Sequence, residues 1–552
     1  MSLLEKLSPE LILRIASFLE QIDLLNVSLT CRYLKETTES ELYRMFSNPF
    51  LHSCTIAKFV LRLVKRPKLA EYVRAIDLKG WQTLNELDPI HYVSNYELSG
   101  IQTTREEKIE TFDRFQKPEP TEDEYALLTA AGMTAGIIKE ALPYDPESDI
   151  IQKVRSMLPE DAPRGSPWFN NIFGDDAVQN MPFDQKFCEL LRAGIEDAYV
   201  ALLLALLQNL KTLFLGGVER DPISIGLSRP LHGFRALQTL KLCCMETQEA
   251  WGIDYLESIL AGSALKELYV HNASSWCQQD PYDVNRPVTL RLLPGSLHLT
   301  TLEMVDCTLW QSEMQTLLNA TKSLRSLLYW TGDEEWNFTS HELVEMLEPF
   351  KDTLEKLFLE IAPFWTDFED EGRLTTLSHF SALKVLDTTS AMWENLTELE
   401  IDGHPIDAEQ YLCYRLPPNL ETLILHSPPR REGDRGDWDE LNNPDKCQIQ
   451  HLILEHTSVL PQLHHVYIGS ACDRYAYHLD RMFLEQYQAQ CPNLKFIVGS
   501  GRTHSAPTKS FVDDLPPALS LPEKIWDGEK YSYFVRDKFA VSRSTLSAES
   551  VE

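Results

Sequence analysis

One six-residue phrase recurs along the chain from residue 210 onward and constrains its fold more than any other feature. The phrase is L-x-x-L-x-L or a close variant, and its copies begin at residues 210, 237, 265, 299, 324, 354, 383, 420 and 449. Successive copies are 25 to 37 residues apart. A phrase repeated at such a period is typical of stacked units that bury a continuous core only against their neighbours. The sequence therefore predicts a repeat array, and the main alternative is an ordinary α/β sheet.

The phrase resembles that of leucine-rich repeats, in which each unit is one short strand and one return helix. The full phrase, with a cysteine in its later slot, occurs cleanly once, at Leu299, Leu302, Met304, Cys307 and Leu309. Alternating residues 73–78 predict an earlier strand, and further strand-like pieces begin at Leu396, Leu463 and Leu494. The resemblance implies an α/β fold, an irregular leucine-rich-repeat solenoid with a curved parallel sheet and outer helices.

Residues 7–34 have the pattern of a short helical hairpin. Ser8, Pro9 and Glu10 favour a helix start, because serine can cap, proline suits the first helical position and glutamate meets the positive end of the helix dipole. Apolar residues at helical spacing follow, namely Leu11, Ile12, Ile15, Phe18 and Leu19, and after the cap residue Asp23 come Leu24, Val27, Cys31 and Leu34. A hairpin this small needs a partner, either the rest of the chain or another protein.

This hairpin resembles the F-box, the module that docks substrate receptors onto the Skp-family adaptor of cullin–RING ubiquitin ligases. The positions that match are Leu7, Glu10, Leu11, Ile12, Ile15, Phe18, Leu19, Asp23, Leu24, Leu25, Cys31 and Arg32. The chain departs from the pattern at the first proline of the family, where it has Ser8. The resemblance implies that the residues that contact the adaptor or support the contact are Leu7, Pro9, Leu11, Ile12, Ile15 and Leu25. The alternative is a hairpin that only caps the end of a larger domain.

The sequence divides into four predicted segments. They are a helical F-box at residues 1–50, a helical connector at 51–72, the repeat array at 73–500 and a partly disordered extension at 501–552. The strand at 73–78 resembles the first strand of the array in fungal-type F-box proteins. An irregular insertion covers about residues 82–183, with helices expected near 122–142 and 150–158. Another helix is expected over residues 186–207, with a buried apolar centre.

Charge and composition restrict the partners. The chain has 51 basic and 83 acidic residues, a net charge of −32, which argues against nucleic acid and anionic membranes as partners. The N-terminus lacks a signal-peptide pattern, and the longest clear apolar run, residues 198–207, is too short to span a bilayer. Eleven cysteines without a Cys-x-x-Cys pair indicate reduced thiols. We therefore expect a cytoplasmic or nuclear protein.

Motifs for catalysis are absent from the sequence. There is no phosphate-binding loop, dinucleotide fingerprint or G-x-S-x-G nucleophile turn. His341 begins a sequence like that of zinc proteases, but the second histidine is missing. His464 and His465 are adjacent, so a strand would turn them to opposite faces, away from a shared metal ion. The prediction is a protein that is not an enzyme and needs no cofactor or metal; an enzyme in the 82–183 insertion is the weaker alternative.

The repeats predict a binding surface. In L-x-x-L-x-L the leucines point into the core, so the residue between the last two lies on the other, concave face of the sheet. The large side chains expected there are Phe214, Tyr269, Leu328, Phe358, Ile424, Ile453 and Tyr467. Such an apolar stripe is typical of a contact site for a client protein. The alternatives are that the insertion or the tail covers it, or that the register is off by one.

Together these features predict a substrate-recognition subunit of an SCF-type (Skp–cullin–F-box) ubiquitin ligase. The F-box would bind the adaptor and, through it, the cullin–RING ligase, while the repeats would hold a client for ubiquitin-dependent degradation. The second hypothesis is an interaction scaffold built on leucine-rich repeats that never enters a ligase. The sequence identifies no client.

Overall fold

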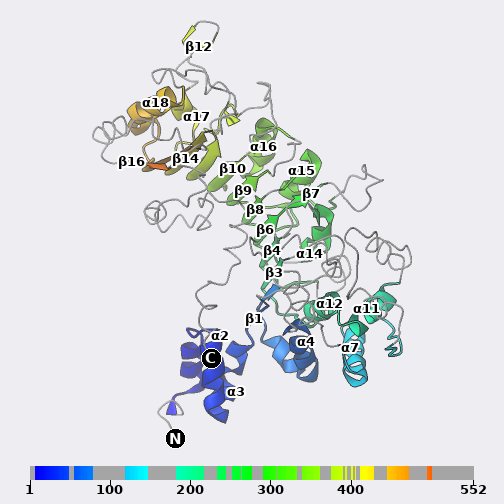
Figure 1. Ribbon diagram of the computed structural model, residues 1–552. Coiled ribbons are helices and arrows are strands. Elements are labelled where there is room, and N and C mark those ends of the chain that lie inside the picture. Colours follow the sequence, from blue (N-terminus) through cyan, green and yellow to red (C-terminus); the bar gives the residue numbers. More distant parts are fainter. Residues whose placement is uncertain are drawn as a thin grey trace, which may run out of the picture. The chain divides into compact units, whose positions relative to one another are not determined.

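The computed structural model describes much of the chain (Figure 1). The chain forms two compact units. The units are Met1–Leu265 with Cys277–Arg286, and Lys266–Trp276 with Pro287–Glu552. The described residues are 6–48, 55–78, 119–146, 182–216, 233–243, 251–262, 264–275, 290–305, 307–331, 338–360, 374–389, 392–393, 400–401, 404–405, 411–427, 444–470 and 494–499. The expected helix at 150–158 and the extension at 501–552 lie outside them.

The first unit begins with three helices, α1 (Pro9–Ala16), α2 (Gln21–Thr30) and α3 (Arg32–Leu42). The second predicted helix is confirmed as α2, but its expected continuation through Cys31 is wrong. Cys31 is extended, with φ −157° and ψ 163°, and its Sγ accepts a hydrogen bond from the backbone N–H of Leu34 at 3.5 Å. Cys31 therefore ends α2 and caps α3.

The sheet of the first unit is parallel and follows the chain in the order β1, β2, β3, β4. Its strands are β1 (Met45–Ser47), β2 (Ala75–Leu78), β3 (Thr212–Gly216) and β4 (Thr239–Cys243). The strand expected at residues 73–78 is thus confirmed as β2. β1 was not predicted, because its sequence lies in a stretch that was expected to be helical.

The remaining elements of the first unit are mostly helical. They are α4 (Thr55–Lys65), η2 (Pro67–Glu71), α7 (Glu122–Thr134), α11 (Phe183–Arg192), α12 (Glu196–Leu206), β5 (Trp251–Gly252), η4 (Ile253–Leu256) and α14 (Glu257–Leu260). The single helix expected over residues 186–207 is wrong. Gly194 has φ +70° and interrupts it, and the N–H of Ile195 donates to the Leu190 carbonyl at 2.9 Å, as in a Schellman motif. The predicted burial of its apolar centre is confirmed, with Leu202 and Leu203 fully buried.

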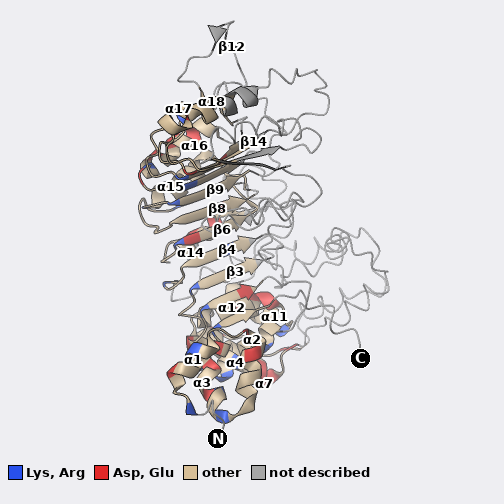
Figure 2. Cartoon of the chain, turned by 90° about the vertical axis from the view of Figure 1, so that its left-hand side faces the viewer, with Lys and Arg blue, Asp and Glu red and all other residues tan. Residues whose placement is uncertain are grey.

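The second unit also contains a parallel sheet whose strands follow the chain (Figure 2). The strands are β6 (Glu267–His271), β8 (Thr301–Val305), β9 (Ser326–Trp330), β10 (Lys356–Glu360), β11 (Val385–Thr389), β14 (Thr422–Ser427), β15 (His465–Ser470) and β16 (Lys495–Gly499). The helices between them are α15 (Gln311–Ala320), α16 (Ser340–Leu347), η5 (Glu348–Phe350), α17 (Leu412–Arg415) and α18 (Pro444–Val459). Short strands complete the unit, namely β7 (Ala273–Ser274) and the antiparallel pair β12 (Glu400–Ile401) and β13 (His404–Pro405).

The copy of the phrase at residue 449 is not a strand. It lies inside α18, and the next strand is β15, close to the strand-like piece at Leu463. Leu452, Ile453 and His456 are buried along α18 at helical spacing. Because a short apolar run fits both a strand and one face of a helix, the phrase alone did not distinguish them.

Most of the described strands of the two sheets begin in the same way. One backbone carbonyl of the preceding strand segment accepts two successive N–H groups. In the first unit the carbonyl of Arg74 accepts from Lys211 and Thr212 at 2.8 and 3.0 Å. In the second unit the carbonyl of Glu355 accepts from Lys384 and Val385 at 2.9 and 3.1 Å. This shared hydrogen-bond pattern fixes the register of each strand against the one before it.

Two glycines of the first unit approach each other closely. A Cβ atom placed on Gly262 would lie 2.7 Å from the carbonyl oxygen of Gly233. We therefore expect Gly262→Ala to lower the free energy of unfolding by about 1–3 kcal/mol, because the backbone must shift. Thermal unfolding measures the loss. Gly132→Ala is the control, since its Cβ would meet only side-chain atoms at 3.4 Å or more; equal effects of the two variants would contradict the steric explanation.

Candidate docking site

Two apolar stripes are exposed on the N-terminal helices. Leu11, Ile15 and Phe18 recur at steps of four and three residues along α1 and the turn that follows it, and Phe18 is 80% exposed. Ile22, Leu25 and Leu29 recur at steps of three and four along α2, and Leu29 is 73% exposed. We call these six side chains the docking stripes. Large apolar residues at such spacing on the surface of a helix are typical of a site for a partner.

A separate set of side chains holds the helices together. α3 contacts both α1 and α2, and the buried residues at these contacts include Ile12, Leu24 and Leu34. The fold of the three helices therefore does not depend on the docking stripes. They are available for contact with another molecule.

The predicted adaptor-binding residues fall into different environments. Leu11, Ile15 and Leu25 are exposed in the docking stripes, Pro9 is exposed at the start of α1, and Leu7 is half-buried. Ile12 is only 4% exposed, so in this structure it supports the site from the core and does not form part of its surface. The adaptor contacts themselves remain predictions.

Sequence reasoning missed three of the most exposed members of the stripes. Phe18 was assigned to the apolar face of the first helix, while Ile22 and Leu29 were not singled out. The signal was present, because Ile22, Leu25 and Leu29 form a row that is offset from the buried Leu24. Two apolar rows on one helix indicate that one faces the core and the other faces a partner.

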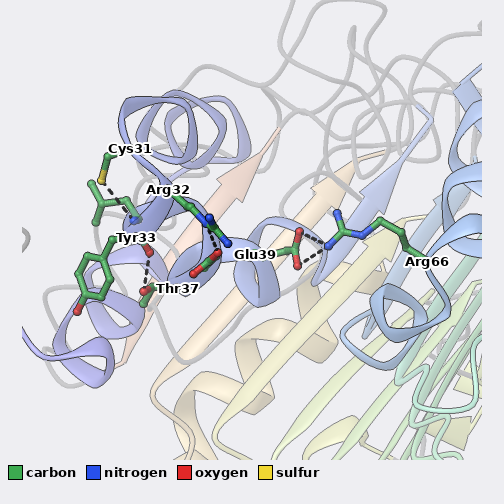
Figure 3. Close-up of polar contacts among 8 residues, drawn as sticks. Cys31, Arg32, Tyr33, Thr37, Glu39 and Arg66 are labelled. Carbon is green, nitrogen blue, oxygen red and sulfur yellow. Dashed lines mark hydrogen bonds and ion pairs between the residues drawn. The ribbon is translucent and has the colours of Figure 1, made fainter.

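Local hydrogen bonds position the start of the chain and α3, and Figure 3 shows those within α3. The Tyr33 hydroxyl donates to the Leu7 carbonyl at 2.9 Å, which ties the start of the chain to α3. The Thr37 hydroxyl donates to the Tyr33 carbonyl at 2.8 Å, and Arg32 pairs with Glu36 at 2.7 Å. Hydrogen bonds from its own backbone and from Ser8 hold the pKa of Glu10 below its ordinary value.

The predicted client-binding residues of the strands form a row. In the second unit the residues at this position of successive strands are register partners across the sheet. In strand order they are Tyr269, Glu303, Leu328, Phe358, Asp387, Ile424 and Tyr467. In the first unit Phe214 pairs with Lys241. Ile453 is not part of a strand, because it lies in α18. Its assignment to the sheet face was therefore wrong.

Most of this row is not open to a client. Phe214, Leu328, Phe358 and Ile424 are all at most 8% exposed. Tyr269 is half-buried, and burial together with the nearby Glu303 and Glu267 carboxylates raises the pKa of its hydroxyl. Because side chains this deeply buried cannot contact a partner without rearrangement, the row does not form the open apolar stripe that was expected. A client-binding role for these residues remains a prediction.

The described residues meet neither the requirements of a metal site nor those of a membrane-spanning helix. No three His, Cys, Asp or Glu side chains within those ranges are grouped to hold a metal ion. No helix among the described residues is long and apolar enough to cross a membrane. His341 pairs with Glu345 at 3.4 Å on the surface of α16, which is an ordinary helical spacing for such a pair.

Comparison with known families agrees with this site. Residues 6–48 match the family model described as F-box-like, which spans α1, α2, α3 and β1. No curated protein matches the chain. The N-terminal region is therefore an F-box-like domain, followed by a mostly parallel α/β structure. Both docking stripes lie within the matched residues.

Proposed function

We propose that this chain is a substrate-recognition subunit of an SCF-type ubiquitin ligase, working in the cytoplasm or the nucleus. The F-box-like domain would bind the Skp-family adaptor, as F-box domains generally do, and the rest of the chain would hold a client protein. The observation that carries the proposal is the pair of exposed docking stripes inside the matched region. In this role the chain is a receptor and not an enzyme.

Burial of the docking stripes against the adaptor would favour the complex. Fully burying one leucine, isoleucine or phenylalanine side chain contributes about 1.5–3 kcal/mol. Several such contacts can exceed the cost of association, which is about 4–15 kcal/mol. Phe18 and Leu29 are the most exposed members, so they gain the most from burial. We expect these two residues to be the centre of the adaptor contact.

The second part of the proposal concerns the repeats. The parallel strands, most of them carrying the L-x-x-L-x-L phrase and many followed by a helix, support a leucine-rich-repeat-like array as the client-binding part. The net charge of −32 favours clients with a basic or neutral surface. Holding the client beside the ubiquitin carrier would accelerate transfer by raising the local concentration of the client.

The test uses the purified full chain with a purified Skp-family adaptor and a cullin–RING pair. We expect the chain to co-elute with the adaptor, and the adaptor complex to recruit the cullin, in size-exclusion chromatography. Binding to the adaptor without recruitment of the cullin would favour the scaffold hypothesis. Failure to bind the adaptor at micromolar concentration would overturn the proposal.

A further inference from the structure

The F-box-like domain contributes a strand to the sheet of the first unit. β1 lies within the matched residues 6–48, yet it pairs in parallel with β2, placing Phe46 next to Ile76. The same register continues from Ile76 to Leu213 and from Leu213 to Leu240. Phe46 therefore takes the position that buried apolar residues take in the next strands.

The hydrogen bonds at the start of β2 repeat the pattern found in the rest of the sheet. The carbonyl of Arg44 accepts from the N–H groups of Arg74 and Ala75 at 2.8 and 3.1 Å. The carbonyl of Arg74 does the same for the two residues that begin β3. After β1, the N–H of Asn48 donates to the Asp77 carbonyl at 2.8 Å. The side chain of Asn48 is fully buried. The segment that ends the F-box-like domain thus behaves as one more strand of the array.

The sequence of this segment is an altered copy of the repeated phrase. Tyr43, Phe46 and Asn48 stand at the spacing of L-x-x-L-x-L, and the next copy begins 30 residues later with Val73. That interval lies within the 25 to 37 residues that separate successive copies from residue 210 onward. Terminal units of repeat arrays are atypical because one side has no neighbouring repeat.

The helix that follows completes this first unit of the array. α4 buries Ile56, Val60 and Leu63. Beside these residues on the same helix, the Phe59 ring stacks on Phe46, with ring centroids 4.1 Å apart and ring planes 8° from parallel. The Phe59 ring also stacks on the Tyr43 ring, with the two ring centroids 6.4 Å apart. β1 and α4 therefore supply one strand and one following helix, as in a repeat.

The preceding helices hold this strand in place. The Gln21 side-chain amide, at the start of α2, donates to the carbonyl of Met45 in β1 at 3.0 Å. Glu39 on α3 binds the Arg66 guanidinium with both carboxylate oxygens, at 2.8 and 2.9 Å (Figure 3). An uncovered edge strand exposes unpaired backbone groups and invites wrong pairing, so such contacts protect the end of a sheet.

We infer that the F-box-like domain has a second function, as the N-terminal cap of the sheet, and that residues 43–72 are the first repeat of the array. The domain would then present the docking stripes with α1 and α2 while β1 closes the edge of β2 and Gln21 of α2 holds β1. This capping function does not depend on adaptor binding.

Hydrogen exchange of the full chain tests the cap, with the amides of Arg74 and Ala75 as reporters because they donate to Arg44. Phe46→Ala removes the ring that packs on Phe59 and should loosen β1. We expect these two amides to exchange at least about tenfold faster, since local opening becomes easier. The exchange rates of the Lys211 and Thr212 amides should increase next, because these amides donate to the carbonyl of Arg74. Loss of protection across the whole first unit would equally support a cap.

Phe18→Ala is the matched control, since it removes the same kind of side chain from an exposed position of the same domain. We expect it to leave the exchange of Arg74 and Ala75 unchanged. Two truncations isolate the contribution of β1. The chain without residues 1–42 keeps β1, and the chain without residues 1–48 lacks it. If Arg74 and Ala75 keep their wild-type protection in Phe46→Ala and in the longer deletion, the inference is overturned, whatever the result of the adaptor experiment.

Discussion

Replacing Phe18 or Leu29 with aspartate is expected to weaken binding of the Skp-family adaptor by about 100-fold or more. Both side chains are largely exposed in the free chain, at 80% and 73%. A buried apolar contact would be lost, and a carboxylate would have to enter the interface without a partner. Isothermal titration of each full-length variant with the purified adaptor measures the change.

The same substitutions should leave the fold intact. Because neither side chain belongs to the core of the helices, the melting temperature should stay within a few degrees of wild type. Leu127→Asp is the control, since Leu127 is an exposed leucine on α7, outside the F-box-like domain. Wild-type adaptor affinity in both the Phe18→Asp and the Leu29→Asp variants would refute the docking stripes as the adaptor site.

Arg192→Met is expected to destabilise the helices around α11 by about 3–5 kcal/mol. Arg192 is buried and bonds to the Glu189 carboxylate and to the Pro143 carbonyl. Its guanidinium also lies over the Tyr125 ring of α7, 5.3 Å from the centroid. Removing the arginine leaves the Glu189 charge and a carbonyl buried without their partner. Hydrogen exchange in α7 and α11 measures the free energy of local opening.

A double substitution separates the pair from its surroundings. Glu189→Leu combined with Arg192→Met replaces two buried charges by apolar groups of similar size, which is often close to neutral. We therefore expect the double variant to recover most of the stability lost by Arg192→Met. A single variant as stable as wild type would show instead that Arg192 contributes nothing net to the contact between α7 and α11.

The periodic parts of the fold could be predicted from the sequence. Leu213, Leu240 and Leu302 are fully buried in parallel strands, as the repeated phrase predicts, because leucines at a fixed spacing fill one face of every strand. The register of the row through Leu328 and Ile424 follows from the same spacing. The burial of this row could not be predicted from the phrase, because the phrase specifies which face of the sheet a residue occupies and not what covers that face.

Other features depend on contacts that a linear pattern does not contain. The helix break at Gly194 depends on a left-handed glycine inside a run that otherwise favours helix. β1 was missed because Tyr43, Phe46 and Asn48 replace the leucines of the phrase. At the docking site, the resemblance located the domain, but only the packing of α3 shows that Ile12 is buried while Phe18 is exposed.

The strand shared by the two parts of the first unit affects how truncated forms of the chain would behave. A shortened protein without residues 1–48 is a natural choice for separating the proposed client capture from the proposed ligase assembly. It would also lack β1 and the carbonyl of Arg44, which accepts two hydrogen bonds from the next strand. Under the proposed function, weak client capture by such a shortened protein would then reflect damage to the sheet as well as loss of adaptor binding. Point substitutions in α1 and α2 avoid this ambiguity.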